Sequence, residues 1–304
     1  MDRRRYVQLV GAGGALSLSG CLGGSSPSTE SEVAGETPGE TLTVATATTT
    51  RDSGLLDELL PGFEATFGAT VDTVARGTGA ALRTARNGDC DLVFVHARPL
   101  EDAFLREGHG VNRRAVMVND FLLVGPSDDP AGVAGADPVE AVTAIAASEA
   151  PFLSRGDRSG THLRERRLWS EAGIDPAGSW YTESGQGMGN TLTMAAQSGS
   201  YTLTDRGTFL NVDAAGLAAH VAHGIEDPPA LLRNEYAAIP VDPVRHDAAY
   251  PLAMAFLGYV TGPGQTRIEE FRVAGERAFR PLGRTREPRF DQYVPSDWPN
   301  ADDP

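Results

Sequence analysis

The chain has 304 residues, of which 40% are hydrophobic, and its formal net charge is −15. This length suffices for one large or two medium domains, so we expect a folded, soluble protein. All 26 basic residues are arginine, because the sequence contains no lysine. The acidic balance argues against nucleic-acid binding, which needs a positive surface, and is typical of proteins that stay dispersed at high salt. We expect a halophilic archaeal host. A GC-rich genome would explain the missing lysine but not the acidity.

Residues 1–21 have the order of an export signal: arginines at positions 3 to 5, a short apolar stretch, and then Cys21. The stretch is too short and too rich in glycine to span a bilayer. The paired arginines resemble a twin-arginine signal, and LSGC (residues 18–21) resembles a lipobox, whose cysteine carries the lipid anchor. A cleaved signal with an incidental cysteine is the alternative. Residues 22–40 have almost nothing to bury and predict a flexible tether.

Strand and helix patterns alternate over the first part of the chain. Strands are predicted at residues 42–48, 69–75 and 91–97, and helices at 54–68 and 79–88. Pro61 should kink or split the first helix. Apolar strands that alternate with helices predict a parallel sheet covered on both sides. Cys90 precedes the third strand, and we expect a small buried thiol there rather than a reactive one.

A second set of α/β elements follows the long apolar stretch 114–126. Strands are predicted at 151–154, 201–205 and 234–243, and helices at 137–150, 160–173, 189–199, 250–262 and 263–275. We expect an α/β fold with two lobes joined by extended strands. Lobe I comprises residues 41–125 and 237–283, and lobe II residues 126–236. An irregular tail occupies 284–304, and ligands should bind between the lobes, where strands run into helix starts.

Five junctions between strands and helices are rich in glycine and hydroxyl groups: ATATTTRDSG (45–54), RGTGA (76–80), SRGDRSGTH (154–162), SGQGMGN (184–190) and TLTDRGT (202–208). Each offers short donors and free amides at the positive end of a helix dipole, which suits an anion. Taken singly, helix capping explains each junction as well. The arginines at positions 76, 155, 158 and 206 favour a shared oxyanion site. Asp157 can fix the pose of Arg155, although a plain surface ion pair is the alternative.

Other site chemistries fit the sequence less well. His220 and His223 are one helical turn apart, but no carboxylate or cysteine cluster stands near them at metal-ligand spacing, so no metal or other cofactor is expected. Ser159 and His162 are close in sequence, yet the G-x-S-x-G elbow of a serine hydrolase is not present. An anchored hydrolase that uses this pair is therefore a remote alternative.

Several motifs occur in a characteristic order: TATTTRDSGLLDELLPGFE, GTGAAL, NGDCDLVFVHAR, SRGDRSGTH and YTLTDRGT. Together they resemble the tungstate-binding lipoproteins that serve ABC-type tungstate importers, over about residues 42–283. The resemblance implies a type II periplasmic-binding-protein fold, in which two lobes close on a tetrahedral oxyanion. It also implies a monomeric binding protein, not an enzyme, held by its lipid at the outer face of the cell membrane and delivering the ion to a permease.

The family's Thr-Thr-Thr-Ser motif falls on residues 46–49, where Ala47 has lost the hydroxyl group of the second position. The arginine of its Ser-Arg-Gly-Asp motif matches Arg155. We predict that the oxyanion contacts are Thr48, Thr49, Thr78, Arg155, Ser159, Gly160 and Thr161, with Arg206 in direct contact or just behind. Donors alone suit tungstate, which accepts hydrogen bonds only. The turn from Arg155 is also similar to the phosphate-grasping turn of phosphate-binding proteins, so molybdate, sulfate and phosphate remain alternative ligands.

Overall fold

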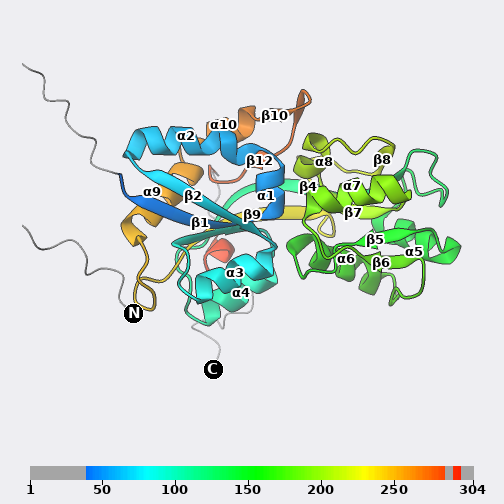
Figure 1. Ribbon diagram of the computed structural model, residues 1–304, viewed down its shortest axis with the longest axis horizontal. Coiled ribbons are helices and arrows are strands. Elements are labelled where there is room, and N and C mark those ends of the chain that lie inside the picture. Colours follow the sequence, from blue (N-terminus) through cyan, green and yellow to red (C-terminus); the bar gives the residue numbers. More distant parts are fainter. Residues whose placement is uncertain (1–38, 285–289, 296–304) are drawn as a thin grey trace, which may run out of the picture. The chain divides into compact units, whose positions relative to one another are not determined.

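A computed structural model describes residues 39–284 and 290–295 of the chain (Figure 1). The signal, Cys21 and nearly all of the tether predicted above lie outside these residues. Three parallel strands begin the fold, with the first in the middle: β1 (Thr41–Ala47), β2 (Thr70–Arg76) and β3 (Leu92–Val95). The helices that connect them are α1 (Thr48–Asp52), α2 (Leu55–Phe67), α3 (Thr78–Arg86) and α4 (Arg98–Arg106). The sequence patterns did not predict α1 and α4.

Strand β4 (Arg114–Pro126) is almost continuously buried and pairs with two groups of strands. Up to Asp120 it pairs antiparallel with β9 (Arg233–Pro240), which in turn pairs antiparallel with β3. From Phe121 onward it pairs with β7 (Thr202–Asp205) and β8 (Leu217–Val221). The sheet is therefore mixed. The parallel pairing predicted for the first strands is confirmed for β1, β2 and β3, whereas the pairs that involve β4 and β9 are antiparallel.

The middle of the chain forms a second group of elements, drawn in green in Figure 1. Besides β7 and β8 it contains β5 (Phe152–Ser154), β6 (Tyr181–Glu183), α5 (Pro138–Ser148), α6 (Gly160–Glu171), α7 (Met188–Ser198) and α8 (Arg206–Asn211). The last part of the chain returns to the first group as α9 (Tyr250–Thr261), α10 (Gly264–Glu270), β10 (Arg272–Val273), β11 (Glu276–Arg277), β12 (Arg280–Pro281) and a 3-10 helix (Phe290–Gln292).

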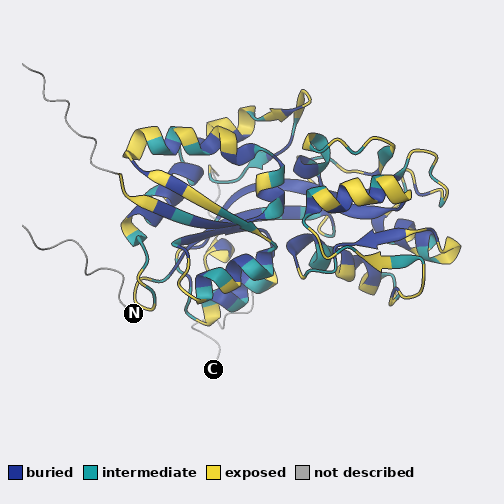
Figure 2. Ribbon diagram, viewed as in Figure 1, coloured by how far each residue is buried: buried dark blue, intermediate teal, exposed yellow. Residues whose placement is uncertain are grey.

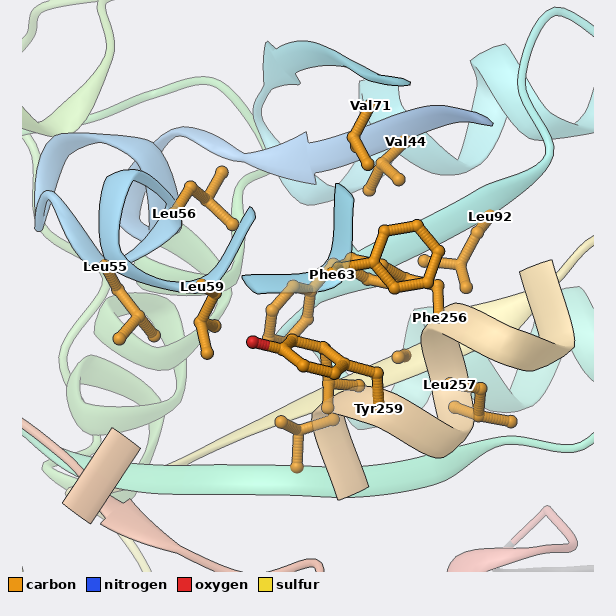
Figure 3. Close-up of a cluster of buried hydrophobic side chains, with 14 of the residues drawn as sticks. Val44, Leu55, Leu56, Leu59, Phe63, Val71, Leu92, Phe256, Leu257 and Tyr259 are labelled. Carbon is orange, nitrogen blue, oxygen red and sulfur yellow. The ribbon is translucent and has the colours of Figure 1, made fainter. Parts of the chain in front are cut away.

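Each group has an apolar core of its own. The first contains an aromatic centre in which Phe63 of α2 packs edge-on against Phe256 of α9 at 5.1 Å between ring centroids (Figure 3). The second forms around Trp169 and Phe152, whose ring centroids are 5.2 Å apart. Figure 2 shows β4 and β9 mostly in the colour of buried residues, whereas the edge strand β2 is mostly exposed or intermediate. Burial of these rings, together with the aliphatic side chains around them, contributes to the stability of each group.

Two helix predictions differ from the structure. Helix α2 continues through Pro61 as one element, because the carbonyl group that Pro61 leaves without a donor belongs to Asp57, which lies on the exposed face and can be hydrated. The helix predicted at 263–275 ends at Glu270. Ala274 and Gly275 both have positive φ, 50° and 83°, and form a tight turn that joins β10 to β11. None of the helices in the described part of the chain has the length and apolar character that crossing a bilayer requires.

Candidate functional site

Two long helices begin at polar junctions without a side-chain cap. Gly77 and Gly187 are the N-cap residues of α3 and α7, and neither offers a side-chain acceptor to the first amides of its helix. By contrast, Asp137 caps α5 by accepting a hydrogen bond from Val139 N at 2.8 Å. The first N–H groups of a helix have no acceptor within the helix. Side-chain capping therefore does not explain the junctions before α3 and α7.

The starts of α3 and α6 lie against each other. A Cβ atom at Gly77 would be 3.1 Å from Asp157 Oδ2 and 3.5 Å from Ser159 Cβ, so a larger residue would push the two helix starts apart. Ser159 caps α6 only in part, because its hydroxyl oxygen accepts one hydrogen bond, from His162 N at 3.3 Å. The hydroxyl hydrogen of Ser159 can still be donated to another partner.

The start of α1 lies next to Arg155, which directly precedes the turn into α6. Arg155 Nη1 donates to the hydroxyl oxygen of Thr48 at 3.2 Å, and a Cβ atom at Gly187 would lie 3.6 Å from Thr48 Cγ2. Ala47 is the N-cap residue of α1, and without a hydroxyl group it cannot cap that helix. Residues from four separate junctions thus come together around Arg155.

Buried hydroxyl groups without a partner mark this region. Among the described residues, five buried side-chain N or O atoms have no hydrogen-bond partner in the protein, and three of them are the hydroxyl oxygens of Thr50, Thr78 and Thr161. These three threonines lie in the first turns of α1, α3 and α6. An unsatisfied buried hydroxyl group costs about 1 to 3 kcal/mol. Three such groups at helix starts fit a polar ligand that accepts their hydrogens.

Arg155 is the charged centre of the site. Its side chain is only 1% exposed, and its guanidinium donates to the Asp157 carboxylate and to the backbone oxygen of Gln186, at 3.2 Å for the latter. Asp157 accepts a further hydrogen bond from Ser159 N at 3.0 Å. The aspartate therefore fixes both the arginine and the turn that leads into α6, and the guanidinium is not free to swing out to solvent.

A chain of buried hydrogen bonds determines which group accepts the hydroxyl hydrogen of Thr49. The Asp205 carboxylate accepts a hydrogen bond from Thr208 N and another from the side-chain NH2 group of Asn119 at 3.4 Å. The side-chain oxygen of Asn119 therefore faces Asn234 and accepts a hydrogen bond from Asn234 Nδ2 at 2.8 Å. The Asn234 oxygen, 2.8 Å from His96 Nδ1, must then accept from the ring.

With its hydrogen on Nδ1, a neutral His96 can only accept at Nε2, and Thr49 Oγ1 lies 3.1 Å from that atom. Burial lowers the pKa of His96 to about 4, so the ring is neutral at pH 7. The Thr49 hydroxyl hydrogen therefore belongs to His96. The donor that Thr49 can offer a ligand is its backbone N–H, rather than the hydroxyl group suggested by the sequence motif.

Arg206 is engaged elsewhere. Its guanidinium binds Asp120 through two hydrogen bonds, of 2.6 and 2.9 Å, and lies 3.8 Å from Glu276. Asp120 is fully buried in β4, at the point where that strand changes partners, and also accepts from the backbone amide of Gly224 at 2.9 Å. No contact joins Arg206 to the other predicted site residues within the described part of the chain, so its geometry is that of a structural ion pair.

Of the predicted contacts, the structure brings together Thr48, Thr49, Thr78, Arg155, Ser159, Gly160 and Thr161. A Cβ atom at Gly160 would lie 2.7 Å from His96 Cε1, which explains the glycine at the start of α6. Sequence reasoning missed His96 and Thr50. The third threonine of TATTT was a visible signal for Thr50, whereas nothing in the sequence around His96 indicates that β9 supplies its partner.

Two other chemistries can be judged on geometry. His162 Nδ1 accepts from Arg158 N at 3.0 Å, and the contact between Ser159 and His162 uses the histidine backbone, so the imidazole is not placed to activate the serine. Cys90 is buried, and burial raises its pKa to about 12, which makes the thiol unreactive as predicted. The described residues contain no group of three or more His, Cys, Asp or Glu side chains that could hold a metal ion.

Comparisons with known proteins show the family of the chain. Residues 31–263 match the model of the PBP superfamily domain. A candidate ABC transporter anion-binding protein of Haloferax volcanii is 47% identical over an alignment of 308 positions, which covers 97% of this chain and 90% of that protein. The tungstate-binding protein TupA of Peptoclostridium acidaminophilum is 42% identical over 236 residues, covering 77% of this chain and 80% of TupA.

Among solved structures, the tungstate ABC transporter protein of Geobacter sulfurreducens matches with a TM-score of 0.70 and 48% identity, over 76% of this chain and 99% of that one. TupA of Desulfovibrio alaskensis matches with a TM-score of 0.66 and 39% identity, over 80% and 99%. The fold and these matches define a protein of the periplasmic-binding type. The chain belongs to the PBP superfamily and, within it, to the family of the tungstate-binding protein TupA.

Proposed function

We propose that this protein captures tungstate outside the cytoplasm and delivers it to an ABC importer. The observation that carries the proposal is the pair of buried, unpartnered hydroxyl groups of Thr78 and Thr161, which stand at two adjoining helix starts beside Arg155. Tetrahedral oxyanions accept several hydrogen bonds from short donors held in fixed positions, and helix starts add backbone amides and a favourable dipole.

The hydrogen-bond donors at the candidate site favour an ion that carries no proton. Thr78, Ser159 and Thr161 can donate hydroxyl hydrogens, and the amides of Gly160 and Thr49 add backbone donors. Both oxygens of the nearby Asp157 carboxylate already accept hydrogen bonds, from Arg155 and from the backbone of Ser159. Monohydrogen phosphate needs an acceptor for its proton, whereas tungstate, molybdate and sulfate do not. This favours the dianions without protons, and the tungstate-binding relatives favour tungstate among them.

The same kind of binding protein for molybdate, sulfate or phosphate is the nearest alternative. Ala47 lacks the hydroxyl group of the family motif, and the loss falls at the cap of α1, so the selectivity of this site can differ from that of its relatives. A serine hydrolase is the remote alternative, and the engagement of the His162 ring with the Arg158 backbone does not favour it.

Export and anchoring are part of the proposal. The arginines and Cys21 of residues 1–21 lie outside the described residues, and we propose that they direct export and carry a lipid, so that the folded part hangs from the outer face of the membrane. The membrane partner would be the permease subunit of the importer. The relative from Haloferax volcanii and the net charge of −15 support a haloarchaeal host.

Isothermal titration calorimetry tests the binding function. Protein freed of bound ions would be titrated with tungstate, molybdate, sulfate and phosphate at one fixed high salt concentration. We expect tungstate to bind with nanomolar affinity and phosphate at least about a thousandfold more weakly, a difference of about 4 kcal/mol. Sulfate or phosphate binding as tightly as tungstate would reject the tungstate assignment.

A further inference from the structure

Within the described residues, no carboxylate forms an ion pair with Arg164. Its half-buried guanidinium donates to the backbone oxygens of Ala230 at 2.9 Å and Arg233 at 3.1 Å, and lies over the Phe121 ring at 5.7 Å from the centroid. Carbonyl groups and an aromatic face satisfy the donors of an arginine, but they carry no net negative charge.

The other arginines of α6 differ in this respect. Arg166 pairs with Asp175 at 2.8 Å and Arg167 with Glu171 at 3.6 Å, both on the exposed side of the helix. Among the residues that the structure describes, Arg164 forms no ion pair. Burial, and then repulsion by Arg167, lower the pKa of Arg164 to about 10. The protonated form is therefore disfavoured by its surroundings, although it is still fully charged at pH 7.

The position of Arg164 in the helix adds to this imbalance. It is the fifth residue of α6, one turn from Gly160, and side chains of a helix lean toward its N-terminus. A cation near the positive end of a helix dipole is unfavourable, whereas an anion is favoured there. An anion bound at the start of α6 would relieve both the repulsion by the dipole and the lack of a counter-charge.

Ring contacts connect Arg164 to the oxyanion site. The Phe121 ring beneath its guanidinium is 6.2 Å from the His96 ring, measured between centroids. His96 in turn packs on Gly160 and binds the Thr49 hydroxyl group at 3.1 Å. Arg164 and Arg155 both contribute to the depressed pKa of this histidine, as two positive charges near the ring would.

The charges at the site itself do not balance a dianion. Arg155 is the arginine that faces the ion, but it is paired with the carboxylate of Asp157. We infer that Arg164 supplies the second positive charge of the oxyanion site, acting across a short distance without touching the ion, and that it makes the site prefer dianions to monoanions of the same shape. This inference rests on the proposed function and names the charge class of its ligand.

Perrhenate provides the test, because it is tetrahedral like tungstate but carries one negative charge instead of two. Affinities of both ions would be measured by calorimetry for the wild type and for Arg164→Gln, with perrhenate titrated both directly and as a competitor of tungstate. The electrostatic energy between two charges is proportional to the product of the charges. Arg164→Gln should therefore lower the affinity for tungstate about tenfold and the affinity for perrhenate only about threefold. Arg164→Lys should keep the wild-type ratio of the two affinities.

Arg167→Gln is the matched control, since it removes an exposed arginine from the same helix and should leave both affinities unchanged. Equal losses for tungstate and perrhenate in Arg164→Gln, or losses in Arg164→Lys as large as those in Arg164→Gln, would overturn the inference and assign Arg164 a packing role. A wild-type protein that does not bind tungstate would instead reject the proposed function. Thermal unfolding of each variant shows whether the fold is retained.

Discussion

The guanidinium of Arg155 donates a hydrogen bond to the hydroxyl group of Thr48 at 3.2 Å, although the two residues are 107 positions apart in the sequence. Thr48 begins α1 in the first group of elements, and Arg155 follows β5 in the second. This contact joins the two groups at the site where the unpartnered hydroxyl groups lie. An ion held by both residues would stabilise that arrangement, as expected of a binding protein that closes on its ligand.

Replacing Arg155 should abolish tight binding. Arg155→Gln removes a charged donor and leaves the Asp157 carboxylate unpaired next to the anion, so tungstate affinity should fall by a factor of about 100 or more, at about 1.5 to 3 kcal/mol for each charge-assisted hydrogen bond. Calorimetry at fixed salt measures the change. Arg166→Gln, which removes an exposed arginine paired with Asp175, should bind tungstate like the wild type. A similar loss in both variants would point to a general charge effect instead.

Replacing the threonines whose hydroxyl groups have no partner should weaken tungstate binding without lowering stability. Thr78→Val and Thr161→Val keep the shape of the side chain but remove a buried hydroxyl group that has no partner in the protein. Each should leave the free energy of unfolding unchanged or raise it by up to about 1 kcal/mol, and weaken tungstate about tenfold.

Thr208→Val is the control for these two variants, because the Thr208 hydroxyl donates to Asp205 at 2.6 Å. It should destabilise the protein by about 1 to 3 kcal/mol and leave affinity nearly unchanged. Denaturant unfolding and calorimetry on the same samples give both quantities. Valine variants at positions 78 and 161 that unfold more easily but bind normally would contradict the ligand role.

Replacing Arg206 should have the opposite effect: it should lower stability and leave tungstate binding nearly unchanged. Because its partner Asp120 is fully buried, Arg206→Met leaves a carboxylate without its counter-charge and should lower the free energy of unfolding by about 3 kcal/mol. The folded variant should bind tungstate within about threefold of the wild type, since Arg206 contacts Asp120 and Glu276 and, within the described residues, no contact joins it to Arg155, Thr78 or Thr161. A loss of binding as large as that of Arg155→Gln would return Arg206 to the site.

The sequence contained enough information to predict the strand-to-helix junctions and to nominate most residues of the candidate site. Hydroxyl groups, glycines and arginines cluster locally at residues 154–162, so their shared role could be inferred from order and spacing. What the sequence could not show depends on pairing between distant segments. The engagement of Arg206 by Asp120, the hydrogen bond from Thr49 to His96, and the antiparallel partner of β3 are each determined by strands more than 40 positions away.

The buried histidine predicts a pH dependence of stability. Burial lowers the pKa of His96 from 6.5 to about 4, so between these values the unfolded chain binds a proton that the folded protein does not. Wild-type stability should therefore lose a contribution as the pH falls from about 7 to about 4, and His96→Gln should lack this loss, which amounts to about 3 kcal/mol.

The measurement is the difference in unfolding free energy between wild type and His96→Gln, by denaturant titration at several pH values. Taking the difference cancels groups such as Glu165, whose pKa burial raises to about 7 and which acts with the opposite sign. A difference that does not change between pH 7 and pH 4 would mean that His96 titrates as it does in the unfolded chain, which would contradict the account of a buried ring that stays neutral.

If the starts of α3 and α6 and Arg155 hold tungstate, as we propose, the tungsten atom must lie among them. The most direct measurement is a crystal structure of the tungstate complex with anomalous data collected at a tungsten absorption edge, which locates the metal atom independently of the chain. We predict one strong peak within about 5 Å of the hydroxyl oxygens of Thr78 and Thr161 and of the Arg155 guanidinium, the distance of an oxyanion centre from its donors. A peak elsewhere, with these three residues making no contact to the ion, would contradict the account.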